Sequence, residues 1–271
     1  MKAIGKFIHN NLHLLRRLSQ IGSLVLIIVI PFLNKSGINF LKGTYYSISI
    51  GNLDIIDPAM ALQMILLTKS ILITVLLMMV VPVLLALILG KVFCSWACPF
   101  NFIAELLTKF KKSPATHVRN PKAHYYWMIF AVILLFIMML GIPVIAFISM
   151  PGQISALIAD AIFSGVLGIE ILLVLIILAI EFIFNRKFWC KYVCPVGATL
   201  SLFRIKKTLK ISYNPKKCAS CDAKTENLCV SACPLGLNPK LSGAYPYCYN
   251  CMECVNECRK NGKALSITFN K

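Results

Sequence analysis

Acidic residues are scarce in this sequence of 271 residues: 10 Asp and Glu stand against 28 Lys and Arg, which gives a net charge of +18. Charged residues of either sign make up only 14% of the chain and hydrophobic residues 58%, whereas a soluble domain is about a quarter charged. This shortage of charge indicates a chain that folds in a lipid bilayer. The excess of basic residues fits either nucleic acid or a membrane surface, and the positions of these residues decide between the two.

Histidine is also rare, and the motif Cys-x-x-Cys-His does not occur. None of the four histidines lies inside a long apolar stretch, so the sequence predicts no haem ligand within a bilayer. No small-residue cleavage site follows the first apolar run, which predicts that this run is a retained helix and not a signal peptide.

Four stretches are apolar over about the 20 residues that a helix needs to cross a bilayer. They predict membrane spans at residues 18–33, 70–90, 125–148 and 162–184. Lys and Arg are concentrated in residues 1–20, in 91–124 and from 185 onward, while 149–165 has none. Because basic residues flank spans on the cytoplasmic side, we expect a multi-pass protein of the inner (cytoplasmic) membrane with both termini in the cytoplasm. The lipid bilayer is thus the predicted partner of the basic residues, and nucleic acid is not.

One unit of sequence occurs twice, at an offset of 96 residues, each time directly after a predicted span. The copies cover residues 91–99 and 187–195, and each contains Cys-x-x-x-Cys-Pro. If a helix continues through each pair, its two thiols share a face, and the four thiols can converge. A third cluster or other metal site, a redox dithiol, a quinone pocket and four inert buried thiols are all open. The residues are Cys94, Cys98, Cys190 and Cys194.

Eight of the 12 cysteines lie between residues 218 and 258. The last four have the spacing Cys-x-x-Cys-x-x-Cys-x-x-x-Cys of a bacterial ferredoxin half-site, in which three thiolates bind one 4Fe-4S cluster and the fourth binds the other cluster. The first four form a looser copy, with seven residues between its second and third cysteines. Paired zinc knuckles are the alternative, but triplets followed by Cys-Pro favour iron and sulfur.

With the usual crossover, the tail is predicted to hold two 4Fe-4S clusters. Short apolar runs at 209–213 and 265–269 are expected to be the two strands of a small ferredoxin fold. The predicted ligands are Cys218, Cys221, Cys229 and Cys258 for cluster 1, and Cys248, Cys251, Cys254 and Cys233 for cluster 2.

One carboxylate, Glu181, lies well inside a predicted span, nine residues before Cys190. An acidic residue within a bilayer is a candidate functional group, and quinol oxidation releases protons. Glu181 is therefore a candidate catalytic proton relay, unless it lies close enough to the interface to reach water or a lysine.

Taken together, these motifs resemble the NapH-type quinol dehydrogenase membrane component, within the wider family of membrane-bound 4Fe-4S polyferredoxins. The resemblance is carried by residues 90–99, by 189–197, by the eight tail cysteines and by the stretch 42–63. It implies four helices, two four-iron clusters in the cytoplasm, and electrons drawn from the quinone pool for a partner redox protein.

The expected fold is an all-α membrane domain of four transmembrane helices over residues 1–205, followed by a small α+β bacterial-ferredoxin-like domain over residues 206–271. The chain is expected to be a membrane-bound iron–sulfur electron-transfer protein. As a quinol dehydrogenase subunit, it would oxidise quinol and pass the electrons through the two clusters to a partner redox protein. Two alternatives are a non-catalytic membrane anchor and relay that takes electrons from a cytosolic donor, and a metal-handling reductase that uses the Cys-x-x-x-Cys-Pro thiols. The connection 34–69 is either an ordinary loop or a quinone or partner site.

Overall fold

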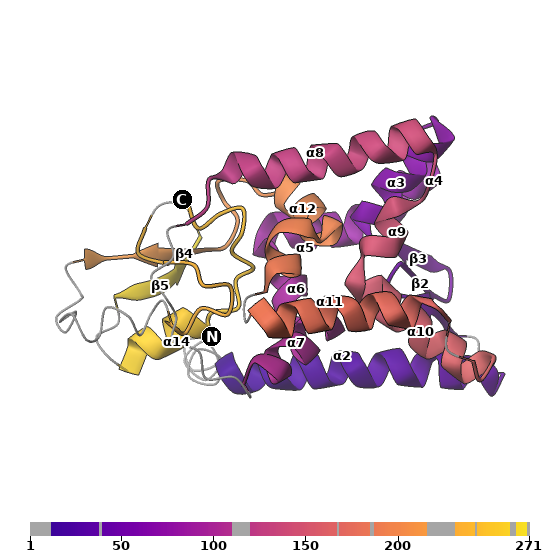
Figure 1. Cartoon of the computed structure of the whole chain (residues 1–271), viewed down its shortest axis with the longest axis horizontal. Coiled ribbons are helices and arrows are strands. Elements are labelled where there is room, and N and C mark those ends of the chain that lie inside the picture. Colours follow the sequence, from indigo (N-terminus) through magenta and orange to yellow (C-terminus); the bar gives the residue numbers. More distant parts are fainter. Residues whose placement is uncertain are drawn as a thin grey trace.

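The computed structural model of the chain describes residues 12–37, 40–109, 120–166, 168–184, 187–215, 231–241, 243–260 and 264–269. Figure 1 shows the helices side by side, with a two-stranded sheet and a short helix at one end of them. The helices are α2 (Leu12–Lys35), α3 (Pro58–Thr68), α4 (Ile73–Met78), α5 (Val80–Leu89), α6 (Val92–Trp96), α7 (Pro99–Lys109), α8 (Ala123–Leu140), α9 (Val144–Ile148), α10 (Met150–Phe163), α11 (Glu170–Phe184), the π-helical turn η1 (Trp189–Val193), α12 (Pro195–Leu202) and α14 (Glu253–Lys260). The strands are β1 (Leu41–Thr44), β2 (Ser47–Ile50), β3 (Leu53–Ile56), β4 (Lys210–Tyr213) and β5 (Leu265–Thr268).

Two of these helices, α2 and α8, are long and apolar enough to cross a membrane. The other predicted spans are shorter. The stretch 70–90 is divided at Met79 into α4 and α5, and the stretch 162–184 is helical in α11 only from Glu170. Helix α8 ends at Leu140, because Gly141 adopts a positive φ of 64°, and α9 begins after Pro143.

The segment expected to connect the first two spans folds into an antiparallel sheet, with strand order β1-β2-β3. Strand β1 packs against α2 and α10, and β3 packs against α4 and α5. Asp57 ends the sheet and begins α3, where its Oδ1 accepts a hydrogen bond from the backbone N–H of Ala59 at 3.2 Å. A side-chain oxygen at this position satisfies a backbone donor that the first turn of a helix leaves open. The segment is therefore an ordered part of the helical region.

The tail contains the two predicted strands. β4 and β5 pair antiparallel, with Lys210 opposite Thr268 and Tyr213 opposite Leu265, which confirms the strands expected at 209–213 and 265–269. Cys254, Val255 and Cys258 of α14 pack on this pair, together with Leu265.

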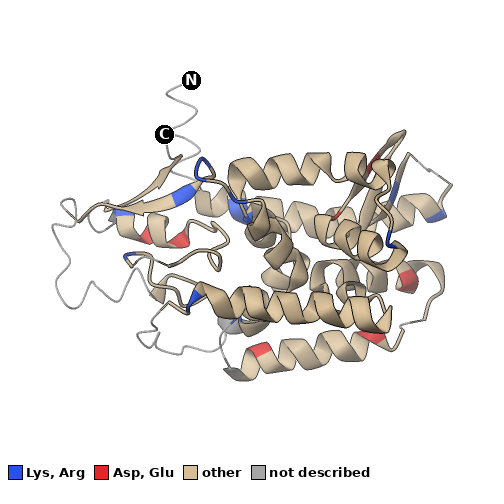
Figure 2. Cartoon of the chain, turned by 90° about the horizontal axis from the view of Figure 1, so that it is seen from above, with Lys and Arg blue, Asp and Glu red and all other residues tan. Residues whose placement is uncertain are grey.

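Arg16 joins the helices to the tail. Its side chain is fully buried, and it donates to Glu105 of α7 at 2.6 Å, to Glu253 of α14 at 2.5 Å and to the carbonyl oxygen of Ser95 at 3.1 Å. Burial alone would raise the pKa of Glu105, but Lys187, Arg16 and Arg17 outweigh it and lower this pKa to about 2. Figure 2 shows that long parts of the helical ribbon carry no charged residue.

Candidate redox site

Four of the eight cysteines in the tail line a single cavity of about 360 Å³. Strand β4 and the segments 233–245 and 248–254 form its walls. Burial raises the pKa of Cys233 and of Cys248 to about 11 and that of Cys251 to about 12, so the free thiols keep their protons at neutral pH. A metal centre that takes thiolates displaces these protons when it binds. The four residues, here called the tail cysteines, are Cys233, Cys248, Cys251 and Cys254.

A tightly wound loop presents three of these thiols. Asn250 and Met252 have positive φ values of 53° and 64°, which lets the chain reverse between Cys248 and Cys254. The Asn250 amide donates to the carbonyl oxygens of Leu89 and Leu209 at 3.0 Å each, and its Oδ1 accepts from the Tyr245 hydroxyl at 2.8 Å. The loop is therefore anchored to the end of α5 and to the residue before β4.

Close packing also explains Gly90, which follows α5. Its φ is 72°, and a Cβ there would lie 3.1 Å from the Asn250 amide nitrogen and 3.3 Å from the Thr208 side chain. The absence of a side chain at Gly90 thus lets the loop approach the helix.

The donor set and the space both fit a four-iron cluster at the tail cysteines. They are the residues predicted for cluster 2, and Cys258 does not line this cavity. Instead Cys258 packs against β5 and accepts a hydrogen bond from the backbone N–H of Leu265 at 3.3 Å. The other predicted ligands of cluster 1, Cys218, Cys221 and Cys229, lie outside the described residues.

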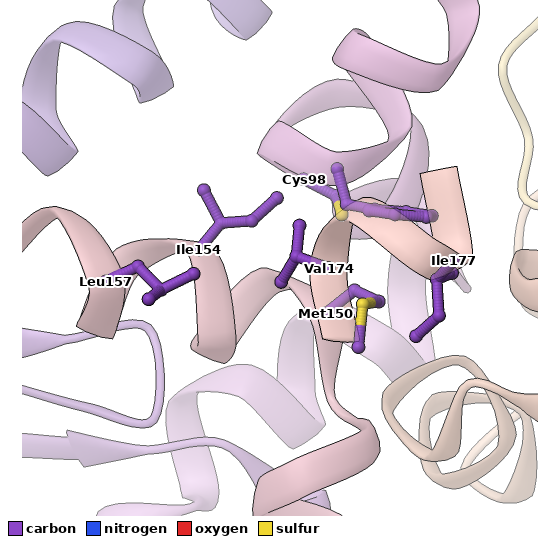
Figure 3. Packing of buried hydrophobic residues seen from close by; sticks show 7 residues of the cluster. Cys98, Met150, Ile154, Leu157, Val174 and Ile177 are labelled. Carbon is purple, nitrogen blue, oxygen red and sulfur yellow. The ribbon is translucent and has the colours of Figure 1, made fainter. Parts of the chain in front are cut away.

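The structure brings the four cysteines of the duplicated unit together around a second cavity. In each copy the helix stops between the two cysteines, unlike the continuous helix considered from the sequence. The second cysteine of each copy directly precedes the proline that begins the next helix, α7 or α12. Cys98 packs with Met150, Val174 and Ile177 from α10 and α11 (Figure 3). These residues, here called the repeat cysteines, are Cys94, Cys98, Cys190 and Cys194.

The space between the repeat cysteines is about 20 Å³, room for little more than one water molecule. Four thiols are a suitable donor set for an iron–sulfur cluster or zinc. A cubane fits there only if the side chains draw apart. The described residues contain no group of three or more His, Cys, Asp or Glu placed to hold a single metal ion.

Two lysines flank the repeat cysteines. Lys91 and Lys187 each precede the first cysteine of their copy by three residues, and both are buried. Lys91 donates to the Tyr126 hydroxyl at 2.8 Å and to the Pro246 carbonyl oxygen at 2.9 Å. Lys187 donates to Asn101 Oδ1 at 2.6 Å and to the Tyr249 hydroxyl at 3.4 Å.

Glu181 is buried near the second copy of the unit. Its two oxygens accept the backbone N–H groups of Phe188 at 2.9 Å and of Trp189 at 2.6 Å. The carboxylate thereby holds the turn that leads into η1 and Cys190, while its role as a proton relay stays a prediction.

A third cavity, of about 360 Å³, shares the lining residues Phe93 and Val196 with the cavity at the repeat cysteines and is here called the apolar cavity. Residues 45–58, 82–97 and part of α12 line it, almost entirely with apolar side chains. Its few polar groups include Asp57 and Trp96. Burial raises the pKa of Asp57, which lies between predicted spans, to about 7.

The cavity at the repeat cysteines adjoins each of the other two. Tyr249 lines both the cavity at the tail cysteines and the cavity at the repeat cysteines. Phe93 and Val196 line both the cavity at the repeat cysteines and the apolar cavity. One layer of side chains therefore separates each cavity from the next.

Sequence reasoning missed the buried lysines, Tyr249 and the part that Asp57 and Trp96 take in a cavity. The lysines had a signal, since each begins its copy of the duplicated unit. Tyr249 had none apart from its place next to Cys248.

Comparison with known proteins points to the same segments. The family model described as "4Fe-4S binding domain" matches residues 71–115 and 166–212, which hold the repeat cysteines. An uncharacterized protein of Methanocaldococcus jannaschii is 29% identical over 71% of this chain and 79% of its own length. No solved structure matches the chain.

Two relatives carry informative names. The ferredoxin-type protein NapH of Escherichia coli is 27% identical over 91% of this chain and 86% of its own length. The methylamine utilization ferredoxin-type protein MauN of Paracoccus denitrificans is 26% identical over 82% of this chain and 75% of its own length. The chain is therefore similar to the NapH- and MauN-type ferredoxin-type proteins, and its duplicated segments match the model of a 4Fe-4S binding domain.

Proposed function

We propose that the chain is a membrane-bound electron-transfer protein that oxidises quinol and passes the electrons through two 4Fe-4S clusters of its tail to a partner redox protein. Oxidation of quinol to quinone releases two electrons and two protons. The two clusters, held by cysteines of the tail, would supply acceptors for one electron each, and the protons would leave to buffer through carboxylates and water. The observation that carries the proposal is the order of the three cavities, from the apolar cavity through the repeat cysteines to the tail cysteines.

The chain's own residues would serve this function in distinct ways. The tail cysteines would hold one cluster, and Cys218, Cys221, Cys229 and Cys258 the other, and the clusters supply one-electron carriers. The loop anchored by Asn250 fixes the first cluster site against α5. Tyr249, buried between two thiol sets, excludes water from the space between them.

Reduction by quinol is the direct test. The protein is purified without oxygen, its clusters are oxidised, and decylubiquinol or menadiol is added while the cluster signal is followed by EPR. The proposal expects reduction by the quinol alone. If the clusters are reduced by dithionite but by neither quinol, the chain is a relay that takes electrons from another donor.

The relay is the second candidate, and the names of the relatives favour it. The NapH and MauN relatives are named as ferredoxin-type proteins, and a ferredoxin carries electrons without oxidising a substrate of its own. In that case a cytosolic donor would reduce the clusters and the quinol would not.

A further inference from the structure

We propose that the apolar cavity binds the ring of a quinone or quinol, with Trp96 and Asp57 as its polar contacts. This assignment rests on the proposed function, which needs a quinone site but does not locate one. The cavity is about 360 Å³, within the range of about 300–1,000 Å³ that is usual for small-molecule sites. Its lining is apolar with a few polar groups, as such sites are.

The position of the cavity suits a ligand that arrives from lipid. Leu85 lines the cavity and is also 54% exposed on the apolar surface of α5. The cavity therefore reaches the outside of the helices at a point where the surface is hydrocarbon. An apolar tail attached to the ring can leave the protein there without crossing a charged surface.

Trp96 supplies an unsatisfied donor. Its indole Nε1 is buried and has no hydrogen-bond partner among the described residues. A buried polar group without a partner costs about 1–3 kcal/mol, so a ligand that brings an acceptor to this group would be stabilised there. A quinone carbonyl oxygen is an acceptor of the right kind.

Asp57 supplies an acceptor. Its Oδ1 is used by the backbone N–H of Ala59, and no residue that the structure describes donates to its Oδ2. A quinol hydroxyl can donate to this oxygen in a charge-assisted hydrogen bond. The site therefore offers a donor for the carbonyl form and an acceptor for the hydroxyl form.

The cavity also lies where electrons are needed. Phe93 and Val196 separate it from the repeat cysteines by one layer of side chains. A lipid acyl chain would fill the same apolar space, but it would use neither Trp96 Nε1 nor the Asp57 carboxylate. The two polar groups are what favour a quinone.

A photoreactive azidoquinone identifies the site directly. The full-length protein in lipid nanodiscs is illuminated with the probe, digested and mapped by mass spectrometry, with decylubiquinone as competitor. We expect labelling within residues 45–58 and 82–97 that the competitor removes. Labelling that maps elsewhere, such as to Leu26 and Ile30 of α2, which line another cavity, or that lipid removes and decylubiquinone does not, overturns the proposal.

Helix α5 offers a matched pair of variants. Leu84 and Leu85 are neighbours with exposed fractions of 52% and 54%, but only Leu85 lines the cavity. Leu85→Trp places a larger side chain at the opening and should weaken decylubiquinone binding about tenfold. Leu84→Trp should leave binding unchanged, and equal effects of the two substitutions would contradict the assignment.

The polar contacts are tested in the same binding assay. Trp96→Phe removes the indole donor and should weaken binding of decylubiquinone, whereas Trp127→Phe, outside the cavity, should not. Asp57→Asn keeps a side chain that caps α3 well and should weaken binding of decylubiquinol more than of decylubiquinone. If neither Trp96→Phe nor Asp57→Asn changes affinity, the proposed contacts are wrong.

Site and function can fail separately. If quinol reduces the clusters but the probe labels residues outside the apolar cavity, the proposed function stands and the quinone site lies elsewhere. If the probe labels the apolar cavity and decylubiquinone removes this labelling, but quinol does not reduce the clusters, the quinone site stands and the proposed oxidation is wrong.

Discussion

Lys91 and Lys187, at equivalent positions of the duplicated unit, both donate a hydrogen bond to the segment around Cys248: Lys91 to the Pro246 carbonyl oxygen and Lys187 to the Tyr249 hydroxyl. No carboxylate among the described residues forms an ion pair with Lys91, which interacts electrostatically with Cys94, Cys194 and Cys248. A buried ammonium group that faces thiols stabilises negative charge placed on them. The two lysines are thus suited to balance the charge of a thiolate-bound cluster.

Replacing Lys91 with Met should lower the midpoint potential of the cluster at the tail cysteines. The reduced cluster carries one more negative charge, so removal of a nearby cation disfavours reduction, by an amount on the order of tens of millivolts. An EPR-monitored redox titration measures the shift, with iron content as the check on folding. Lys206→Met, at an exposed position, is the matched control. If the midpoint potential of the cluster is the same in Lys91→Met and in the unchanged protein, Lys91 does not balance the charge of the cluster.

Arg16→Met should destabilise the docking of the tail on the helices by about 3–5 kcal/mol, because the buried Glu105 and the partly buried Glu253 lose the buried cation that they share. Chemical denaturation in detergent, followed through cluster absorbance, measures the loss. Arg17 is the neighbour on α2 and also pairs with Glu105, but its side chain is 19% exposed where that of Arg16 is fully buried. Arg17→Met should therefore cost clearly less than Arg16→Met. Equal costs would mean that burial of Arg16 does not decide the effect.

The stability should also depend on Glu105 at acidic pH. Its pKa is about 2 in the folded chain, against an ordinary value of 4.5. A carboxyl whose pKa is lower when folded stabilises the fold fully above its unfolded pKa, and this contribution disappears as the pH falls from about 4.5 towards 2. Denaturation midpoints measured between pH 7 and 3 should fall at the acidic end. In Glu105→Gln the acidic part of this slope should be smaller, and an unchanged slope would contradict the assignment.

Glu181→Gln should loosen the turn before Cys190. The amide has one acceptor oxygen where the carboxylate has two, so one of the N–H groups of Phe188 and Trp189 loses its partner, at a cost of about 1–3 kcal/mol. Thermal unfolding measures this structural effect, and quinol-driven cluster reduction measures the proton-relay effect. Slower reduction at unchanged stability would favour the relay, while lower stability at an unchanged rate would leave Glu181 a structural role alone.

The sequence predicted what depends on local spacing. The grouping of Cys233 with Cys248, Cys251 and Cys254 follows from a short cysteine pattern, and the pairing of β4 with β5 follows from two short apolar runs. The convergence of the repeat cysteines follows from duplication, because two copies of one unit that pack together bring equivalent positions close.

What depends on long-range packing was not predictable in this way. Hydropathy treats residues 70–90 as one span and does not show the break at Met79. It also treats 34–69 as a connection, although its short strands form a sheet that packs against α2, α4, α5 and α10. Arg16 is the clearest case, since a basic residue before a span indicates a cytoplasmic end and nothing in its neighbours shows that Glu105 and Glu253 meet it in the fold.

The iron content per chain should decide what the repeat cysteines do. Two four-iron clusters at the eight cysteines of the tail give about eight iron atoms, and a third at the repeat cysteines gives about twelve. The small space between the repeat cysteines favours eight, while the family model that matches their segments favours twelve. Cys98→Ser separates the two: with eight atoms it leaves the iron content unchanged, and with twelve it lowers the content to about eight. Little iron together with stoichiometric zinc would contradict electron transfer itself, because zinc has no redox chemistry and the cysteines would then only stabilise the fold.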